Sequence, residues 1–503
     1  MTDGDPRVRT RAGVLSGAQE AGVAVFRGVP FAEPPVGELR FAAPRPVRGW
    51  DGVREAVAYG PPPPQAGAFG MDGWTKNAGD DWLTLNVWAP EGASGLPVMV
   101  WIHGGGYVIG TSGLPEYDGG RLAREHGVVV VTFNYRLGVE GFAWIEGAPA
   151  NRGLLDQVAA LEWVRDNIRG FGGDPDRVTV FGESAGAGSI AALLAMDRAA
   201  GLFHRAVAQS VPCLFFSAEL AAGIGAACAA ELGLRPSVAD LSTVAPSGLP
   251  AAGDAVGRAL TEERWGRIGF TEIPFAPVVD GEVLTTTPWQ ALAEGAARDV
   301  ELVVGHTRDE YRLFTALDGR LGTTEEEGAA DALRALGPGP GGARAYREAF
   351  GELDPYAMYE LVWSDWLFRM PSLRLAEAQV AGGGRAHVYE LTWQGGGPLG
   401  ACHGLDVPLV FGNLDTGFTA MMIAEGRSAE AKELSAHMRA AWTGFAAHGD
   451  PGWPAYEPGK AGAPGERLVQ VLDTTPAVVP YPEEVSRRIW EGYRFGALGL
   501  GTA

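Results

Sequence analysis

The sequence predicts an α/β fold, because short apolar runs typical of buried strands alternate with stretches that have the composition of helices. The run at residues 178–181 (VTVF) is rich in β-branched and aromatic side chains, and an Ala- and Leu-rich stretch at 185–196 follows it. A second apolar run, at 98–102 (VMVWI), ends in consecutive glycines. A third, at 302–305 (LVVG), leads to charged residues. Strands that end in sharp turns and are followed by helices indicate this class.

The turn between the strand at 178–181 and its helix reads Gly182-Glu183-Ser184-Ala185-Gly186. A serine between two glycines in this setting projects its hydroxyl from a sharp, strained bend. We expect the glycines to be required, because a Cβ atom at either position would clash with the tight turn. The pattern is weak by itself, but the strand before it and the helix after it make Ser184 the candidate nucleophile.

A candidate site for stabilising negative charge follows the strand at 98–102, where the chain reads His103-Gly104-Gly105-Gly106-Tyr107. Consecutive glycines let the backbone approach a bound molecule closely and direct neighbouring N–H groups to one point. Each such donor stabilises the oxyanion of a tetrahedral intermediate by about 3–4 kcal/mol. A flexible cluster is the alternative in a chain with 74 glycines. The order of strand, glycine loop, strand and serine turn favours the site.

A nucleophilic serine needs a base, and the chain contains eight histidines. His403 lies in a loop late in the chain, which fits the order serine, acid, histidine known for such turns. We therefore predict His403 as the base. His306 follows a strand and stays an alternative on position, whereas His103 is expected to brace the glycine loop. The remaining histidines lie in segments that look helical, strand-like or close to surface joints: His126, His204, His387, His437 and His448.

The acid is expected between the serine and the histidine, at the end of another strand. The run at 302–305 leads to two neighbouring carboxylates, Asp309 and Glu310. Spacing alone does not separate them. Most acidic side chains in proteins are simply solvated, so the pair gains weight only from the other members of the set.

Further motifs occur in a fixed order along most of the chain, at residues 26–41 (FRGVPFAEPPVGELRF), 81–88 (DWLTLNVW), 153–157 (GLLDQ), 160–164 (ALEWV), 171–175 (FGGDP), 277–281 (PVVDG), 364–369 (SDWLFR) and 403–412 (HGLDVPLVFG). With the glycine loop and the serine turn, they make the chain resemble the type B carboxylesterases and cholinesterase-like esterases. The closest likeness is to bacterial p-nitrobenzyl-esterase-like carboxylesterases. So many ordered motifs make coincidence negligible.

The resemblance implies an α/β-hydrolase fold, in which a central, mostly parallel sheet is flanked by helices and large helical insertions lie over the active site. It implies one domain over residues 1–503, with cap-like insertions at roughly 215–300 and 315–375. The composition agrees with one domain, because no linker-like or low-complexity segment separates the motifs.

The resemblance also assigns the site. It makes Glu310, and not Asp309, the acid of a triad with Ser184 and His403. The implied oxyanion hole consists of three backbone N–H groups, those of Gly105, Gly106 and Ala185. Three more side chains are implied around the triad: Glu183 on the pocket floor, and Ser210 and Asp406 as supports of the acid and the base.

One departure from the family pattern concerns the loop at 61–77. Trp82 stands where many relatives have Cys, so the disulfide that closes this loop in secreted relatives cannot form. We expect the loop to be less constrained, with Phe69, Met71 and Trp74 shaping the entrance to the site.

The resemblance implies a carboxylic-ester hydrolase that works through a serine acyl-enzyme intermediate, with breadth for small to medium aryl and alkyl esters. An acyltransferase, or an amide or carbamate hydrolase with the same triad, is the alternative. A non-catalytic binding scaffold is disfavoured because the chain keeps Ser184, Glu310 and His403. No cofactor and no metal ion are expected, since no His or Cys cluster has ligand spacing.

The formal net charge of −21 argues against a nucleic-acid partner and against anionic membranes. No apolar run approaches the roughly 20 residues of a spanning helix, and no secretory signal is visible. Cys213, Cys228 and Cys402 are an odd number without metal-like spacing, and Cys402 is interpreted as a packing residue. We expect a cytoplasmic protein, monomeric or weakly dimeric, whose partner is a small ester.

Overall fold

The computed structural model describes residues 5–67, 79–459 and 466–501. The strands of the main sheet are β3 (Ala18–Glu20), β4 (Val23–Pro30), β6 (Thr84–Pro90), β7 (Leu96–Ile102), β8 (Val129–Phe133), β9 (Gly173–Glu183), β10 (Arg205–Gln209), β13 (Glu301–Thr307), β14 (Ala386–Leu391), β15 (Leu468–Leu472) and β16 (Ala477–Pro480). This 11-stranded sheet has the order β16-β15-β14-β13-β10-β9-β7-β8-β6-β4-β3. The strands from β15 to β8 in that order are parallel, and antiparallel strands flank them. Short pairings also join β1 (Arg7–Arg9), β2 (Val14–Ser16) and β5 (Val53–Glu55), and β11 (Phe216–Ser217) with β12 (Val278–Val279).

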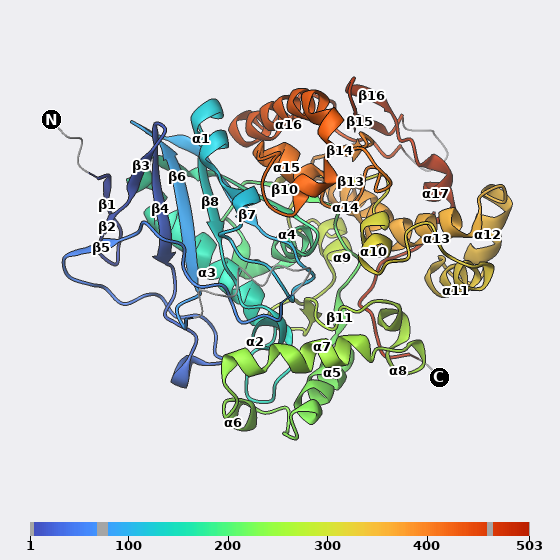
Figure 1. Cartoon of the computed structure of the whole chain (residues 1–503), viewed down its shortest axis with the longest axis horizontal. Coiled ribbons are helices and arrows are strands. Elements are labelled where there is room, and N and C mark those ends of the chain that lie inside the picture. Colours follow the sequence, from blue (N-terminus) through green and yellow to red (C-terminus); the bar gives the residue numbers. More distant parts are fainter. Residues whose placement is uncertain (1–4, 68–78, 460–465, 502–503) are drawn as a thin grey trace.

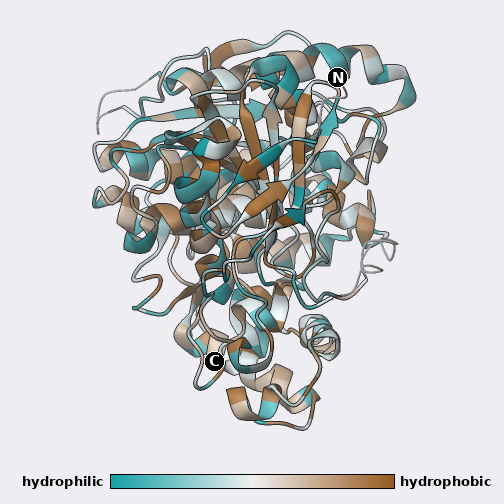
Figure 2. Cartoon of the chain, turned by 90° about the vertical axis from the view of Figure 1, so that its left-hand side faces the viewer, coloured by the Kyte–Doolittle hydropathy of each residue, from teal (hydrophilic) through white to brown (hydrophobic). Residues whose placement is uncertain are grey.

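Both faces of the parallel strands are buried, which is why these strands are almost continuously apolar. Along β7, Val98, Val100 and Ile102 belong to one hydrophobic core, while Met99 and Trp101 belong to the core on the opposite face. The first core is covered by α3 (Arg152–Asn167), α4 (Ala185–Ala195) and α14 (Met370–Ala381), and the second by α1 (Gly120–His126), α15 (Asp406–Phe411) and α16 (Ser428–His448). Figure 2 shows the hydrophobic strands enclosed by helices with mixed polar surfaces.

Long helical segments connect β10 to β13 and β13 to β14. The first segment contains α5 (Ala218–Glu231), α6 (Val238–Leu241), α7 (Pro250–Arg258), α8 (Glu262–Trp265) and α9 (Pro288–Ala293). The second contains α10 (Arg312–Leu317), α11 (Glu326–Leu336), α12 (Gly342–Ala349) and α13 (Pro355–Ser364). In Figure 1, α5 to α8 lie below the sheet and α11 to α13 lie to its right. The remaining α-helices of the described residues are α2 (Gly138–Phe142) and α17 (Glu484–Ile489), and a π-helical turn at Asp365–Arg369 joins α13 to α14.

The α/β fold predicted from the sequence is confirmed. The runs at 98–102, 178–181 and 302–305 lie in β7, β9 and β13, and the Ala- and Leu-rich stretch after the serine turn is α4. After α16, β15 and β16 extend the sheet at one edge, and α17 follows them. Phe69, Met71 and Trp74 lie outside the described residues.

Candidate active site

The carboxyl ends of β7, β9, β10 and β13 bring the predicted site residues to one edge of the sheet, where α/β folds bind their ligands. Ser184 follows β9 directly and precedes α4, with φ 57° and ψ −123°. This backbone conformation is rare for a residue with a side chain and stores strain. The serine is therefore held in a conformation that a relaxed chain avoids, as the turn pattern predicts.

The two glycines of the turn are required by space. A Cβ atom at Gly182 would lie 2.6 Å from the carbonyl oxygen of Ile102, and one at Gly186 would lie 2.0 Å from the same oxygen. The clash that the sequence predicts within the turn is therefore mainly a clash with the end of β7. Glycine at both positions lets the serine turn pack directly against the strand that leads into the glycine loop.

The glycine loop runs beside the nucleophile, since a Cβ atom at Gly104 would lie 3.2 Å from Cβ of Ser184. Gly105 and Gly106 have φ of 103° and 60°, values that favour glycine. Among the described residues, the N–H groups of Gly105, Gly106 and Ala185 donate no hydrogen bond. Backbone donors without a protein partner, close to a serine hydroxyl, are suited to holding an oxyanion.

His403 and Glu310 form a buried pair, with 2.6 Å between Nδ1 and Oε2. The contact joins residues 93 positions apart in the chain. His403 is 5% exposed and Glu310 is fully buried. Phe368 stacks on the imidazole at a centroid distance of 4.2 Å, and Phe314 lies 5.2 Å away. The aromatic rings fix the plane of the imidazole and exclude water from one of its faces.

Glu310 is supported by two further donors. Its Oε1 accepts hydrogen bonds from the Ser210 hydroxyl at 2.6 Å and from the Thr307 N–H at 2.9 Å. Burial raises the pKa of this carboxyl, but the charge and hydrogen bond of His403, together with Ser210, hold it below the ordinary value. Glu310 therefore stays ionised beside the imidazole.

The neighbouring carboxylate, Asp309, has a different partner. Its Oδ2 accepts a hydrogen bond from the N–H of Ala401 at 2.8 Å, and its own N–H donates to the carbonyl of Ala401 at 2.9 Å. Arg312 lies 3.1 Å from its Oδ1. Asp309 thus holds the backbone of the loop that carries His403, while Glu310 holds the imidazole.

Glu183 lies at the other nitrogen of the imidazole, with 2.9 Å between its Oε1 and Nε2 of His403. The approach is close but not aligned as a hydrogen bond, and both atoms lack an aligned partner among the described residues. No hydrogen bond within those residues joins Ser184 to His403. Burial lowers the pKa of His403, but the charges of Glu183 and Glu310 outweigh it and raise the pKa to about 10.

Asp406 lies differently from the expectation that it supports Glu310 and His403. Its Oδ2 accepts a hydrogen bond from the Tyr389 hydroxyl at 2.8 Å, and in the described part of the chain no hydrogen bond joins it to Glu310 or His403. Burial, reinforced by the charge of Glu183, raises its pKa to about 7. The reason for the difference is that Asp406 begins α15 and packs toward Tyr389 on β14.

The other candidate groups have structural partners. Nε2 of His306 lies 3.1 Å from the Tyr481 hydroxyl, and His103 stacks on Tyr135 below the glycine loop, at 4.5 Å between ring centroids. Burial lowers the pKa of each histidine to about 4, and it raises the pKa of the Cys402 thiol to about 12. Within the described residues no group of three or more His, Cys, Asp or Glu side chains could hold a metal ion.

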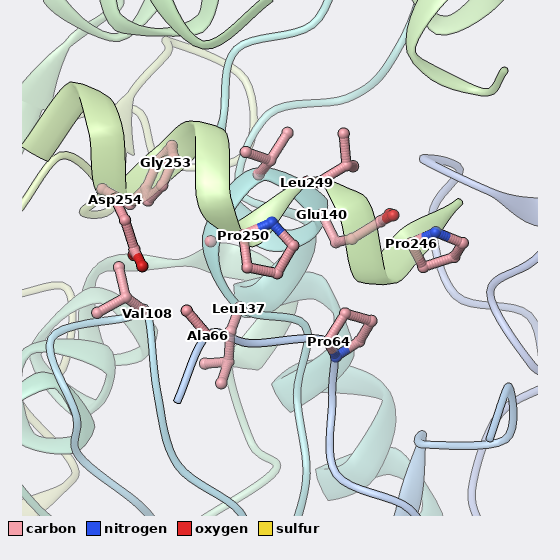
Figure 3. Close-up of a pocket in the computed structure, with 13 residues that line it drawn as sticks. Pro64, Ala66, Val108, Leu137, Glu140, Pro246, Leu249, Pro250, Gly253 and Asp254 are labelled. Atoms are coloured by element: carbon pink, nitrogen blue, oxygen red, sulfur yellow. The ribbon is translucent and has the colours of Figure 1, made fainter. Parts of the chain in front are cut away.

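A pocket lies beside the glycine loop, between α2 and the start of α7 (Figure 3). Its lining is mostly apolar and includes Val108, which is two residues beyond Gly106, and Phe275. The carboxylates of Glu140 and Asp254 also line it, whereas Ser184 and His403 do not. The pocket therefore adjoins the candidate oxyanion hole without containing the nucleophile.

A strained serine between β9 and α4, neighbouring N–H groups that donate to no group in the described ranges, and a buried histidine–glutamate pair define an α/β-hydrolase with a serine nucleophile. Residues 4–334 match the model of the carboxylesterase family. The chain is 39% identical to para-nitrobenzyl esterase of Bacillus subtilis, over 96% of this chain and 97% of that protein. It is 36% identical to fumonisin B1 esterase of Sphingopyxis macrogoltabida, over 91% of this chain and 86% of that protein.

Solved structures agree. One of PNB esterase superposes with a TM-score of 0.86 at 38% identity, covering 96% of this chain and 99% of the other. A carboxylesterase of Geobacillus stearothermophilus superposes with a TM-score of 0.85 at 35% identity, again covering 96% of this chain and 99% of the other. The chain belongs to the carboxylesterase family, and it is a carboxylic-ester hydrolase of the serine type. In the ranges that the structure describes, no helix is long and apolar enough to cross a bilayer.

Proposed function

We propose that Ser184, His403 and Glu310 carry out the ester hydrolysis. The observation that supports this assignment best is the buried contact of 2.6 Å between His403 Nδ1 and Glu310 Oε2, beside a serine held with φ 57°. The carboxylate keeps the proton on Nδ1, so that Nε2, which lies beside Glu183, accepts the proton of the serine hydroxyl once the imidazole is neutral.

In the first half of the reaction, Ser184 Oγ bonds to the ester carbonyl carbon while its proton passes to His403 Nε2. The carbonyl oxygen becomes an oxyanion, which accepts hydrogen bonds from the N–H groups of Gly105, Gly106 and Ala185. His403 then donates its proton to the departing alkoxide, and the alcohol leaves. In the second half, water gives a proton to His403 and attacks the acyl carbon, and Ser184 recovers its proton as the acid departs.

The substrates we propose are small to medium aryl and alkyl esters. The relatives named para-nitrobenzyl esterase and fumonisin B1 esterase support ester substrates of different size. We also infer a monomer or weak homodimer without a nucleic-acid partner, as the net charge of −21 favours. Three buried, unpaired cysteines support a reducing, cytoplasmic environment.

The test is the hydrolysis of p-nitrophenyl acetate and p-nitrophenyl butyrate by the wild type and by Ser184→Ala. Saturable turnover that falls to background in Ser184→Ala is expected, with an unchanged melting temperature. Ser428→Ala, at an exposed position on α16, is the matched control and keeps full activity. A Ser184→Ala variant that retains the wild-type rate would overturn the assignment. Adding an alcohol acceptor and measuring the product ratio separates hydrolysis from acyl transfer.

A further inference from the structure

The side-chain amide of Gln65 pairs with both backbone groups of one residue, Gly110. Nε2 of Gln65 donates to the carbonyl of Gly110 at 2.8 Å, and its Oε1 accepts from the N–H of Gly110 at 2.9 Å. Nε2 also donates to the carbonyl of Pro63 at 3.1 Å, which fixes the amide within its own segment. The two hydrogen bonds with Gly110 resemble those between paired residues of neighbouring β-strands, and they join residues 45 positions apart in the chain.

Gly110 packs against His103 and Gly104, the residues that begin the glycine loop. A Cβ atom at Gly110 would lie 2.5 Å from Nδ1 of His103 and 3.0 Å from the carbonyl oxygen of Gly104, so its backbone packs directly on these residues. Just before it, the N–H groups of Val108 and Ile109 both donate to the carbonyl of Gly105 at 3.1 Å. The turn that orients the peptide after Gly105 therefore ends at the residue that Gln65 holds.

The side-chain amide of Asn134 also joins the segment at 61–65 to the segment at 110–112. Nδ2 of Asn134 donates to the carbonyl of Pro61 at 3.1 Å, while its Oδ1 accepts from the N–H of Ser112 at 2.7 Å. Asn134 bonds the backbone at Ser112, two residues after Gly110. Gln65 instead bonds Gly110 itself, whose backbone packs on Gly104. The polar side chains of Gln65 and Asn134 therefore hold the described part of the 61–77 loop against the segment that follows the glycine loop.

We propose that Gln65 is a positioning residue for the oxyanion hole: through Gly110 it fixes the direction in which the N–H groups of Gly105 and Gly106 point. The proposal rests on the proposed function, in which these groups hold the oxyanion. Donors of this kind accelerate the reaction only when they are aimed at the place where the charge develops. Losing one oxyanion donor outright lowers kcat about 10²–10³-fold, and a tilted loop costs part of that.

The test compares Gln65→Met, which removes both hydrogen bonds to Gly110 and the one to Pro63, with Gln65→Glu, which keeps only the acceptor for the Gly110 N–H. Gln290→Met is the matched control, because the Gln290 amide is exposed on α9 and bonds only nearby side chains. Measured quantities are kcat, KM and the inhibition constant of an aryl trifluoromethyl ketone. The serine adds to this ketone and leaves an oxyanion like that of the reaction.

We expect Gln65→Met to lower kcat about 10-fold or more, with KM changed less than 3-fold, and to weaken ketone binding by the same factor as kcat/KM. Gln65→Glu gives a parallel loss, because its second carboxylate oxygen faces the carbonyl oxygens of Gly110 and Pro63, and it keeps the test valid if Gln65→Met does not fold. The proposal is overturned if both variants keep kcat within 2-fold of the wild type, or if kcat falls while ketone affinity does not. The activity of Ser184→Ala is measured separately. If Ser184→Ala stays active, the triad assignment fails, and this outcome is distinct from failure of the role proposed for Gln65.

Discussion

Nε2 of His403 lies 2.9 Å from Oε1 of Glu183. Because Glu310 occupies Nδ1, the imidazole sits between two carboxylates, one at each nitrogen. Both anions stabilise the imidazolium and raise the pKa of His403 despite its burial. A general base must be neutral to accept a proton, so this arrangement sets the pH above which the proposed triad works.

We expect Glu183→Gln to lower the pKa of His403, because the carboxamide keeps the shape of the side chain and removes one stabilising anion. The base is then neutral at lower pH, and the acid limb of kcat/KM moves down by about 1–2 pH units. A pH profile of kcat/KM on a neutral ester measures this. Glu282→Gln, at an exposed position, is the control. An unchanged or higher midpoint contradicts the role assigned to Glu183.

Glu310→Gln is expected to lower kcat by roughly 10³–10⁴-fold, as loss of the acid does in a triad in which it orients the imidazole and stabilises its charge. The hydrogen bonds from Ser210 and Thr307 still find an oxygen acceptor, so the fold is retained. Steady-state kinetics and thermal melting are measured together, with the exposed Glu294→Gln as control. A loss below 10-fold in a folded variant would show that Glu310 is not the triad acid.

Asp309→Ala is expected to disturb the loop that carries His403, because the buried N–H of Ala401 loses its acceptor. An unsatisfied buried donor costs about 1–3 kcal/mol of the free energy of unfolding. Asp309→Asn keeps an oxygen acceptor and is expected to lose less, while Arg312→Ala removes the ion pair alone. Urea unfolding and kcat of the three variants are compared. Equal losses for Asp309→Ala and Arg312→Ala would assign the effect to the ion pair.

Gly186→Ala is expected to displace the serine turn, since the new Cβ atom would lie 2.0 Å from the carbonyl oxygen of Ile102. Overpacking of this kind costs about 1–3 kcal/mol and here also shifts Ser184. The melting temperature and kcat both fall. Gly341→Ala is the matched control, because its Cβ atom meets nothing within 4 Å and its φ is −97°. A Gly186→Ala enzyme with wild-type kcat would exclude a tight packing requirement.

Local patterns predicted the elements that depend on near neighbours in the chain. The continuous apolar run at 98–102 and the strand–glycine–serine sequence around Ser184 carry their own signals, because strand burial and turn sterics act over a few residues. The edge formed by β15 and β16 was missed: it has short runs, and its pairing with β14 depends on a strand about 80 residues earlier. The placement of Phe368 on His403 was also missed, although the motif containing it was recognised.

The sequence by itself determined the class, the nucleophile turn and the glycine loop, because each is a contiguous pattern whose geometry follows from glycine, strand and helix preferences. Spacing did not separate the two neighbouring carboxylates, and the resemblance favoured Glu310; the tertiary structure shows Glu310 at the imidazole and adds the partner of Asp309, the backbone of Ala401. The hydrogen bonds between Asp406 and Tyr389 and between Gln65 and Gly110 also follow only from the tertiary structure. These contacts join side chains to partners distant in sequence, and their direction depends on how packed elements face one another, which chain spacing does not encode.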